Sequence, residues 1–307
     1  MPSLVSDSLA WVVIGAFVAG ALLYRRDEKA ARYVTSAAWG LFAVFWLQLI
    51  PHFAFVHKSY IEGFLSLAAV PACLYAGYLL YSGRETLFVL SRAVAVMGLV
   101  YLPFETIPAF TLLGLSVPSP RGVLIETVAL QTKFLVNALG YHPEFIASEE
   151  EFVNTFLFMD GDHRLTVEVV LACTGLGSMA IFGGLVAAVE APLRRKFRAL
   201  AVAIPVIYAL NLLRTTFITI TFGKQYMQWF VDEILLLFGS SDPYMVSFFI
   251  SDRIISQLLA VVVLIGITYL VVRELPELLT IIEDVLFLVT GDEYDLEAEL
   301  GLNRPGA

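Results

Sequence analysis

Long apolar segments separated by short polar stretches recur along this chain. A helix needs about 20 apolar residues to cross roughly 30 Å of hydrocarbon. The pattern therefore predicts an all-α polytopic membrane protein. We expect seven membrane-spanning helices, at Leu9–Tyr24, Thr35–Val56, Phe64–Tyr81, Ala93–Leu113, Leu165–Val189, Leu200–Ile220 and Val246–Val272.

Two further apolar segments do not have the pattern of a membrane span. Arg121–Gly140 mixes apolar residues with Glu126, Gln131 and Lys133, which is typical of a helix lying at the membrane interface. Gln225–Phe238 is short for a crossing, so we expect an interfacial or re-entrant helix there. If it crosses the membrane, the number of spans becomes eight.

These elements divide the chain into four segments by sequence order. Residues 1–113 form a half with four spans, and residues 114–164 form an extracytoplasmic loop that contains an interfacial helix. Residues 165–272 hold spans five to seven, which carry the candidate catalytic residues, and residues 273–307 form an acidic cytoplasmic tail. We find no internal repeat and no boundary of a soluble domain.

Composition excludes several classes of protein. The chain is 59% hydrophobic, with a mean hydropathy of +0.80, which is typical of a membrane protein and not of a soluble domain. A net charge of −9, without a basic stripe, argues against a nucleic-acid partner. The two cysteines have no metal-ligand spacing, and we expect neither a metal nor another cofactor. The acid-rich loops, and lysine at only 5 of the 19 basic positions, suggest a halophilic source.

The distribution of basic residues predicts the orientation in the cell membrane. Of the 19 lysines and arginines, 12 lie on one side of the predicted spans and 5 lie on the other side. Loops rich in Lys and Arg stay in the cytoplasm. The N-terminus and the loop of residues 114–164 are then outside, and the C-terminal tail is cytoplasmic.

Two arginines lie inside predicted spans, where a charged side chain costs about 2.5–3.5 kcal/mol on insertion scales. Arg214 in "NLLRTTFITI" lies six residues from the expected outer end of its span, and Arg253 in "FFISDRIIS" lies seven residues from its own. Cys173 in "ACTGLGS" lies eight residues from the outer end of span five. These offsets correspond to depths of about 9, 10 and 12 Å. We therefore expect one thiol and two guanidiniums at one level, near the extracytoplasmic face.

The reactivity of a thiol depends on its neighbours. Apolar burial raises the pKa of a thiol, whereas nearby cations lower it and favour the nucleophilic thiolate. Arginine stays charged when partly buried, so it can stabilise a thiolate or an oxyanion, but it cannot readily act as a base. A cysteine can also serve only packing, and an arginine near a helix end can snorkel to the interface. Gly175 and Gly177 suit either helix packing or the close approach of a substrate backbone.

Three short motifs resemble those of the exosortase/archaeosortase family of membrane-embedded cysteine transpeptidases. They are "ACTGLGS" around Cys173, "NLLRTTF" around Arg214 and "SDRIIS" around Arg253, in this order on successive predicted spans. The specific similarity covers roughly residues 165–255, and the N-terminal half agrees only in its hydropathy pattern.

The resemblance implies an enzyme that processes exported or surface-layer-type proteins. Such substrates carry a C-terminal signal made of a Pro-Gly-Phe-type motif, a transmembrane segment and a basic end. The resemblance implies that Cys173 attacks the peptide bond near this motif and forms a thioester. An amine on the head group of a membrane lipid would then accept the acyl group.

The resemblance also implies roles for neighbouring residues. Exosortases typically offer a histidine at the third motif, where this chain has Arg253, so we assign Arg214 and Arg253 to stabilising the thiolate and the oxyanion. The proton acceptor stays open. From the residues alone, Glu105 either pairs with Arg214 or Arg253 or faces a wet vestibule, and Asp252 and Glu168 are lesser candidates to balance the two cations. Asn211 could hydrogen-bond a guanidinium or the substrate.

A transporter or channel for an anionic substrate is the main alternative function, because buried arginines can line an anion pathway. A pathway requires polar residues through the inner leaflet as well. Spans five to seven instead become uniformly apolar below the three candidate residues, as in "LLAVVVLIGITYLVV". A retinal receptor is excluded because no predicted span contains the lysine needed for a Schiff base.

Overall fold

The structure is a computed structural model that describes residues 4–53, 60–112, 114–148, 152–296 and 298. By length and composition, six of its helices are long and apolar enough to cross a membrane, and the 13-residue α6 (Leu176–Ala188) is a shorter apolar helix. The chain is a predominantly helical, multi-pass membrane protein, as its hydropathy predicts. Residues 54–56 and 113, at the ends of two predicted spans, and Arg304 of the tail lie outside the described residues.

The chain divides into two compact units. The first comprises residues 1–106, 180–201 and 270–307, and the second comprises residues 107–179 and 202–269. Helices α6, α7 (Leu193–Gly223) and α10 (Gln257–Glu274) each contribute residues to both units. These units cut across the four sequential segments expected from the sequence.

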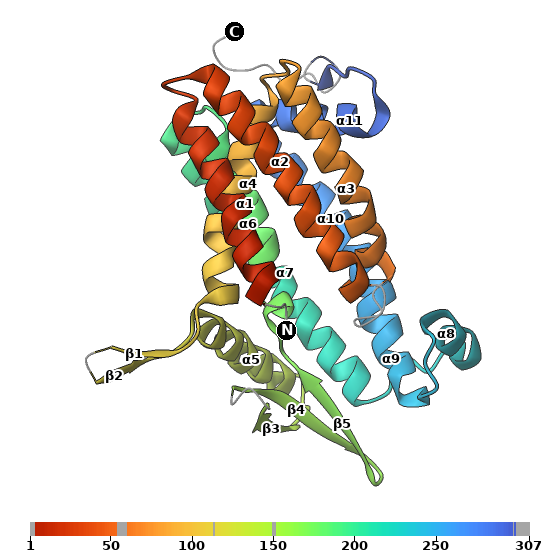
Figure 1. The fold of residues 1–307 in the computed structure, drawn as a ribbon. Coiled ribbons are helices and arrows are strands. Elements are labelled where there is room, and N and C mark those ends of the chain that lie inside the picture. The colour runs from red at the N-terminus through yellow and green to blue at the C-terminus, as the bar shows by residue number, and fades with distance from the viewer. Residues whose placement is uncertain (1–3, 54–59, 113, 149–151, 297, 299–307) are drawn as a thin grey trace. The chain divides into compact units, whose positions relative to one another are not determined.

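The first unit is built on four of the long helices. These are α1 (Leu4–Leu23), α2 (Glu28–Pro51), α3 (Tyr60–Tyr81) and α4 (Leu87–Thr106) (Figure 1). Helix α2 packs against α1 and α3, and α1 also packs against α4. Their core contains the fully buried side chain of Phe17 and the buried side chain of Trp39. The two rings pack edge to face, with their centroids 5.2 Å apart. The indole of Trp39 donates a hydrogen bond to the buried hydroxyl of Ser91 at 2.9 Å, which satisfies its one polar atom.

The acidic C-terminal tail begins with an ordered helix, α11 (Leu279–Thr290), which follows the short 3-10 turn η5 (Pro276–Leu278). Its buried Asp284 accepts hydrogen bonds from Arg84 Nε and Thr86 Oγ1, both at 2.8 Å. The same guanidinium contacts Glu293 at 2.7 Å and lies over the ring of Phe287 at 3.8 Å. Arg84 therefore ties α11 to the connection between α3 and α4.

Asp284→Asn is expected to weaken the attachment of α11 by about 2 kcal/mol, because the buried hydrogen bonds from Arg84 and Thr86 lose their charged acceptor, while Glu293 still compensates the guanidinium. Arg84 lowers the pKa of Glu293. The contribution of this ion pair to stability is therefore fully present above the usual carboxylate pKa and is lost as the pH falls through the lowered pKa. The rate of proteolytic cleavage within residues 279–290 measures the attachment. Glu293→Gln is the matched control, with a much smaller effect expected at its exposed site; equal cleavage rates for wild type and Asp284→Asn would contradict the prediction.

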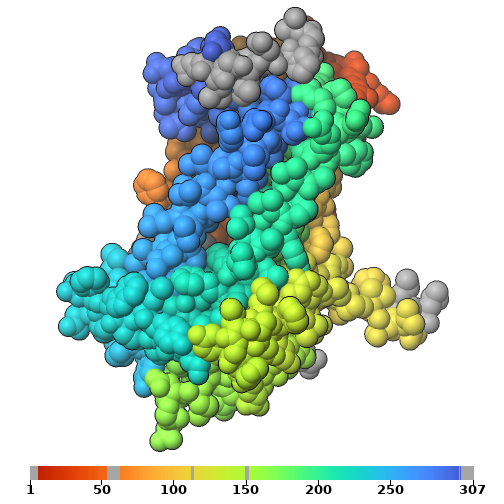
Figure 2. Space-filling view, turned by 180° about the vertical axis from the view of Figure 1, so that it is seen from behind, coloured from red at the N-terminus to blue at the C-terminus, as the bar shows by residue number. Residues whose placement is uncertain are grey.

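The second unit contains the only strands among the described residues. Strands β3 (Glu144–Ala147), β4 (Val153–Asp160) and β5 (His163–Glu168) form an antiparallel sheet with β4 at its centre. Strand β4 packs against α5 (Pro120–Ala138), which lies alongside the sheet (Figure 1). A second hairpin, β1 (Phe110–Leu112) and β2 (Leu115–Val117), stands off from α5 in both views (Figures 1 and 2).

These strands lie within a predominantly helical chain, and β5 overturns the expected start of span five. Residues 165–168, expected to open span five, instead pair with β4, and the register joins Phe158 to Leu165 and Thr155 to Glu168. The stretch alternates in exposure, with β-branched residues between polar ones, and this pattern favours a strand over a helix. The fourth predicted span is also shifted, because α4 begins at Leu87 and ends at Thr106.

The two segments expected to be non-spanning helices have different outcomes. The helix predicted at residues 121–140 is confirmed as α5, which begins behind the N-cap Ser119. Within the segment of residues 225–238, only α8 (Val231–Phe238) is helical. Eight residues are too few to cross a bilayer, so the alternative of an additional span there is wrong.

Candidate active site

Cys173 lies on a short 3-10 turn, η2 (Leu171–Thr174), between the end of β5 and the start of α6. The sequence places it eight residues inside a continuous helix, which is wrong because the helix begins only at Leu176. Gly175 separates the two elements with a φ of 77°, in the left-handed region. The cysteine is therefore at the start of the apolar helix, on a turn fixed by the sheet on one side and by a glycine on the other.

Helix α7 holds the backbone of the cysteine in place. The side-chain amide of Asn211 donates a hydrogen bond to the Cys173 carbonyl oxygen. Thr215, one turn further along α7, has a hydroxyl that lies 3.2 Å from the same oxygen and 3.0 Å from the Asn211 carbonyl oxygen, and its one proton is shared between them. The contacts of Asn211 and Thr215 together fix the position of the Cys173 backbone relative to α7. Asn211 was expected near this site from the sequence, whereas Thr215 was not.

Gly175 permits this contact with α7. A Cβ at residue 175 would lie 3.2 Å from both Cβ and Cγ of Asn211, and its φ of 77° is strained for other residues. Gly177 differs, because a Cβ there would meet no atom within 4 Å.

We therefore expect Gly175→Ala to displace the amide of Asn211 and to slow turnover at least about tenfold, since a small misplacement of reacting groups can cost 10²-fold. Gly177→Ala is the matched control, on the same turn of chain, and is expected to retain activity. The rates are compared in membranes that contain equal amounts of each variant. Equal losses in the two variants would show that the close approach of α7 is not the cause.

The two predicted arginines are joined by Asp252. Arg214 Nη2 on α7 donates to Asp252 Oδ1 at 2.6 Å, and Arg253 Nε lies 3.5 Å from Asp252 Oδ2. The side chain of Asp252 is only 13% exposed. One carboxylate thus holds the two guanidiniums in one cluster. Asp252 was only a lesser candidate from the sequence, because its partner on another helix is not visible there.

Asp252 and Arg253 belong to a π-helical segment, η4 (Phe249–Ser256), between α9 (Val246–Phe248) and α10. Such wide turns within α-helices are rare and often occur at functional sites. The Ser251 hydroxyl donates to the backbone carbonyl of Ser247 in α9, and the Ser256 hydroxyl donates to that of Ser251, each at 2.7 Å. They help to satisfy the backbone where the α-helical hydrogen-bond pattern is interrupted.

The cluster acts on the thiol of Cys173. Burial raises the pKa of this thiol, and a backbone hydrogen bond at Val170, the guanidinium of Arg214 and, more weakly, that of Arg253 oppose the rise. Asp252 reinforces it. The two arginines therefore favour the thiolate in a site that otherwise disfavours charge. Among the described residues, the Nε–H of Arg214 is buried and has no hydrogen-bond partner, so it offers a donor to a ligand.

The remaining candidates lie elsewhere. Glu105 lies near the end of α4, in the first unit, so its pairing with an arginine stays a prediction. Among the described histidines, His163 stacks on Tyr244 with ring centroids 3.9 Å apart, at the end of the sheet hairpin. His57 lies outside the described residues. Among the described residues, no histidine shifts the pKa of the Cys173 thiol.

Comparisons with known proteins agree with the resemblance of the three motifs. The family model described as transmembrane exosortase (exosortase EpsH) matches residues 4–245, a range that includes Cys173 and Arg214 and ends before Arg253. The chain is 72% identical to archaeosortase A of Haloferax volcanii over 303 residues, covering 99% of this chain and 100% of that protein.

A second relative is more distant. Archaeosortase A of Natronomonas pharaonis is 48% identical over 292 residues, covering 92% of this chain and 89% of that protein. No solved structure matches the chain. The family model matches residues 4–245, and the two relatives align with 99% and 92% of this chain. The chain therefore belongs to the transmembrane exosortase family.

Proposed function

We propose that this protein is a membrane-embedded cysteine transpeptidase that removes C-terminal sorting signals from exported proteins. Its two relatives are named archaeosortase A, and the family is that of transmembrane exosortases. The observation that carries the proposal is the cluster in which Arg214 and Arg253, bridged by Asp252, act on the thiol of Cys173. The family relationship favours this enzyme over an anion transporter.

In the first step, the Cys173 thiolate attacks the carbonyl carbon of the scissile peptide bond near a Pro-Gly-Phe-type motif. The negative charge moves to the carbonyl oxygen, where the unpartnered Nε–H of Arg214 can donate to it. The carbon–nitrogen bond then breaks, and the proton lost by the thiol ends on the leaving amine. The products are a thioester on Cys173 and the released C-terminal signal.

In the second step, an amine on a lipid head group attacks the thioester. An amide bond forms between the exported protein and the lipid, the carbon–sulfur bond breaks, and the amine proton returns to the sulfur. Fixing the backbone of Cys173 through Asn211 and Thr215 keeps the sulfur in one position for both steps.

The positive-inside rule places this site near the extracytoplasmic face. Under that orientation the N-terminus is outside, and α11 and the acidic tail are cytoplasmic. A scissile bond at the outer end of a substrate helix and a lipid head group would both reach such a site. No metal or other cofactor takes part in the proposed steps.

The direct test uses the purified protein in vesicles made from lipids with amine head groups, together with a reporter that ends in the tripartite signal. Mass spectrometry is expected to find the reporter without its signal and with the mass of one lipid added. A reporter with a scrambled Pro-Gly-Phe motif is the control and is expected to stay intact. Equal processing of both reporters would contradict the assigned signal, and a product with added water alone would contradict lipid transfer.

A further inference from the structure

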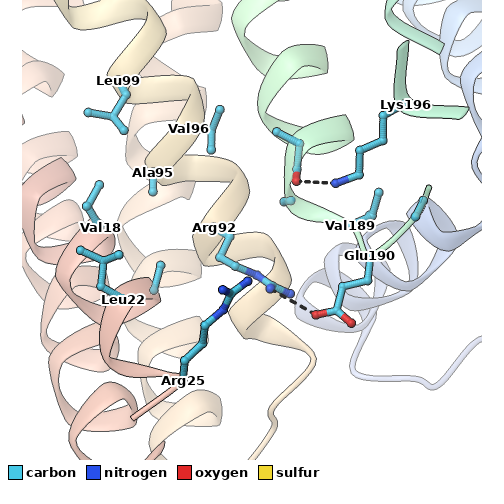
Figure 3. Close-up of a pocket in the computed structure, with 14 residues that line it drawn as sticks. Val18, Leu22, Arg25, Arg92, Ala95, Val96, Leu99, Val189, Glu190 and Lys196 are labelled. Atoms are coloured by element: carbon cyan, nitrogen blue, oxygen red, sulfur yellow. Dashed lines mark hydrogen bonds and ion pairs between the residues drawn. The ribbon is translucent and has the colours of Figure 1, made fainter. Parts of the chain in front are cut away.

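The first unit contains a cavity of about 670 Å³ that the proposed reaction does not use. Its walls come from α1 and the turn that follows it, from α4, and from the chain between the end of α6 and the first turn of α7. One part of the lining is apolar and consists of side chains such as those of Val18, Leu22, Val96 and Leu99 (Figure 3). The other part carries three cations, those of Arg25, Arg92 and Lys196.

The charges in this cavity are unbalanced. Among the described residues that line it, Glu190 is the one carboxylate; it lies 3.5 Å from Arg92, and its side chain is 87% exposed. Lys196 donates to the backbone carbonyl of Ala187 at 2.9 Å, and its charge interacts with those of Glu190 and Glu277 without a direct ion pair to either. Among the described residues, the buried Nε–H of Arg92 has no hydrogen-bond partner.

Figure 3 shows the guanidinium group of Arg25 pointing toward that of Arg92. Two like charges that face each other across a cavity repel, and an anion between them would remove the repulsion. The guanidinium fork matches the oxygens of a phosphate group, and the ammonium of Lys196 can add a further contact. The cationic part of the lining therefore fits a phosphate.

The apolar part of the lining identifies the source of the phosphate. A free phosphate ion would leave these aliphatic side chains in contact with water, whereas the acyl or isoprenoid chains of a lipid would cover them. Basic pockets between membrane helices on the cytoplasmic side bind anionic lipid head groups, and the positive-inside rule predicts this side for Arg25, Arg92 and Lys196.

We propose that this cavity binds one anionic phospholipid, with its phosphate between Arg25, Arg92 and Lys196 and its chains along α1 and α4. Glu190 competes for Arg92, so the bound phosphate takes the place of this carboxylate. The proposal does not depend on the transpeptidase reaction, because every residue involved belongs to the first unit.

The test measures the thermal unfolding of the detergent-solubilised full chain as short-chain phosphatidylglycerol is added. A ligand that binds only the folded state stabilises it by RT ln(1 + L/Kd), where L is the free ligand concentration, so the unfolding temperature continues to rise with the logarithm of that concentration above Kd. Wild type is expected to show this rise with phosphatidylglycerol, and the fit gives Kd; no rise is expected from phosphatidylcholine of equal chain length. Inorganic phosphate and glycerol phosphate are added in separate arms, and a rise equal to that with phosphatidylglycerol would assign the site to a soluble anion and overturn the lipid proposal.

Variants locate the binding within the cavity. Arg25→Gln and Arg92→Gln are each expected to weaken the affinity about tenfold, the effect of losing one charge-assisted contact. Arg26→Gln removes the adjacent arginine, which does not line the cavity, and is expected to bind like wild type. Glu190→Gln removes the competing carboxylate and is expected to bind more tightly.

Two results with the variants would overturn the proposal. The first is an unchanged affinity in both Arg25→Gln and Arg92→Gln, and the second is a loss of affinity in the control Arg26→Gln as large as theirs. If Arg92→Gln does not fold, the exposed Arg25 still gives the loss of affinity, and Glu190→Gln gives a change of opposite sign that general destabilisation does not produce.

Discussion

Cys173→Ala is expected to abolish removal of the C-terminal sorting signal, while the protein keeps its fold and its level in the membrane. The side chain is small and lies on a turn held through backbone atoms, so its removal leaves the contacts of Asn211 and Thr215 intact. Loss of the nucleophile in a protease of known mechanism costs on the order of 10⁶-fold in turnover. Cys173→Ser is also expected to be inactive, because two guanidiniums that support a thiolate do not deprotonate a much weaker acid.

The reporter with the tripartite signal measures this loss, as the fraction of full-length chain that persists. Cys73→Ala is the matched control, because Cys73 is the other cysteine of the chain and is buried in the helical core of the first unit. That variant is expected to process the reporter normally. Normal processing by Cys173→Ala would reduce this residue to a packing role.

Arg214→Gln is expected to lower turnover by about 10²–10³-fold, the loss that follows removal of one oxyanion donor. Two effects combine in this residue. Its Nε–H is the unpartnered donor, and its charge opposes the rise in the pKa of the Cys173 thiol. Removing the cation therefore raises that pKa further and lowers the fraction of thiolate at neutral pH.

The rate at which iodoacetamide alkylates Cys173 separates these effects. If Arg214 supports the thiolate, the midpoint of the alkylation profile moves to higher pH in Arg214→Gln. Arg164→Gln, at an exposed position of strand β5, is the matched control and is expected to leave both the turnover and the profile unchanged. A profile in Arg214→Gln identical to that of wild type would assign this arginine to the oxyanion alone, and wild-type turnover would exclude it from both roles.

Much of the fold can be predicted from hydropathy because a membrane span is a long and simple pattern. Helices α1, α2, α3, α7 and α10 all overlap predicted spans. The sheet does not follow from hydropathy because β4 is a short apolar stretch within the predicted loop of residues 114–164, and β5 runs into the longer apolar segment assigned to span five. The boundary at Gly175 does not follow from hydropathy either, because a glycine inside an apolar run is compatible with a helix, and the approach of Asn211 to Gly175 is a tertiary contact.

The candidate site shows which features a linear pattern can contain. Cys173, Arg214 and Arg253 stand out because each is unusual within an apolar segment. The sequence groups these three residues by their expected depth in the membrane. In the structure they lie on three different elements: Cys173 on a 3-10 turn, Arg214 on α7 and Arg253 on a π-helical segment. Asp252 is 38 positions from its partner Arg214, and Thr215 is 42 positions from its partner Cys173. No local sequence pattern contains contacts between residues so far apart.

The covalent intermediate tests the central claim most directly. The wild-type protein is mixed with a molar excess of a reporter, quenched in acid at short times, digested and analysed by mass spectrometry. A thioester is expected on Cys173, labile to hydroxylamine and carrying the reporter residues that precede the scissile bond. A reporter cleaved within the first turnover, with the acyl group on another residue or with no covalent adduct, would contradict the assignment of Cys173 as the nucleophile.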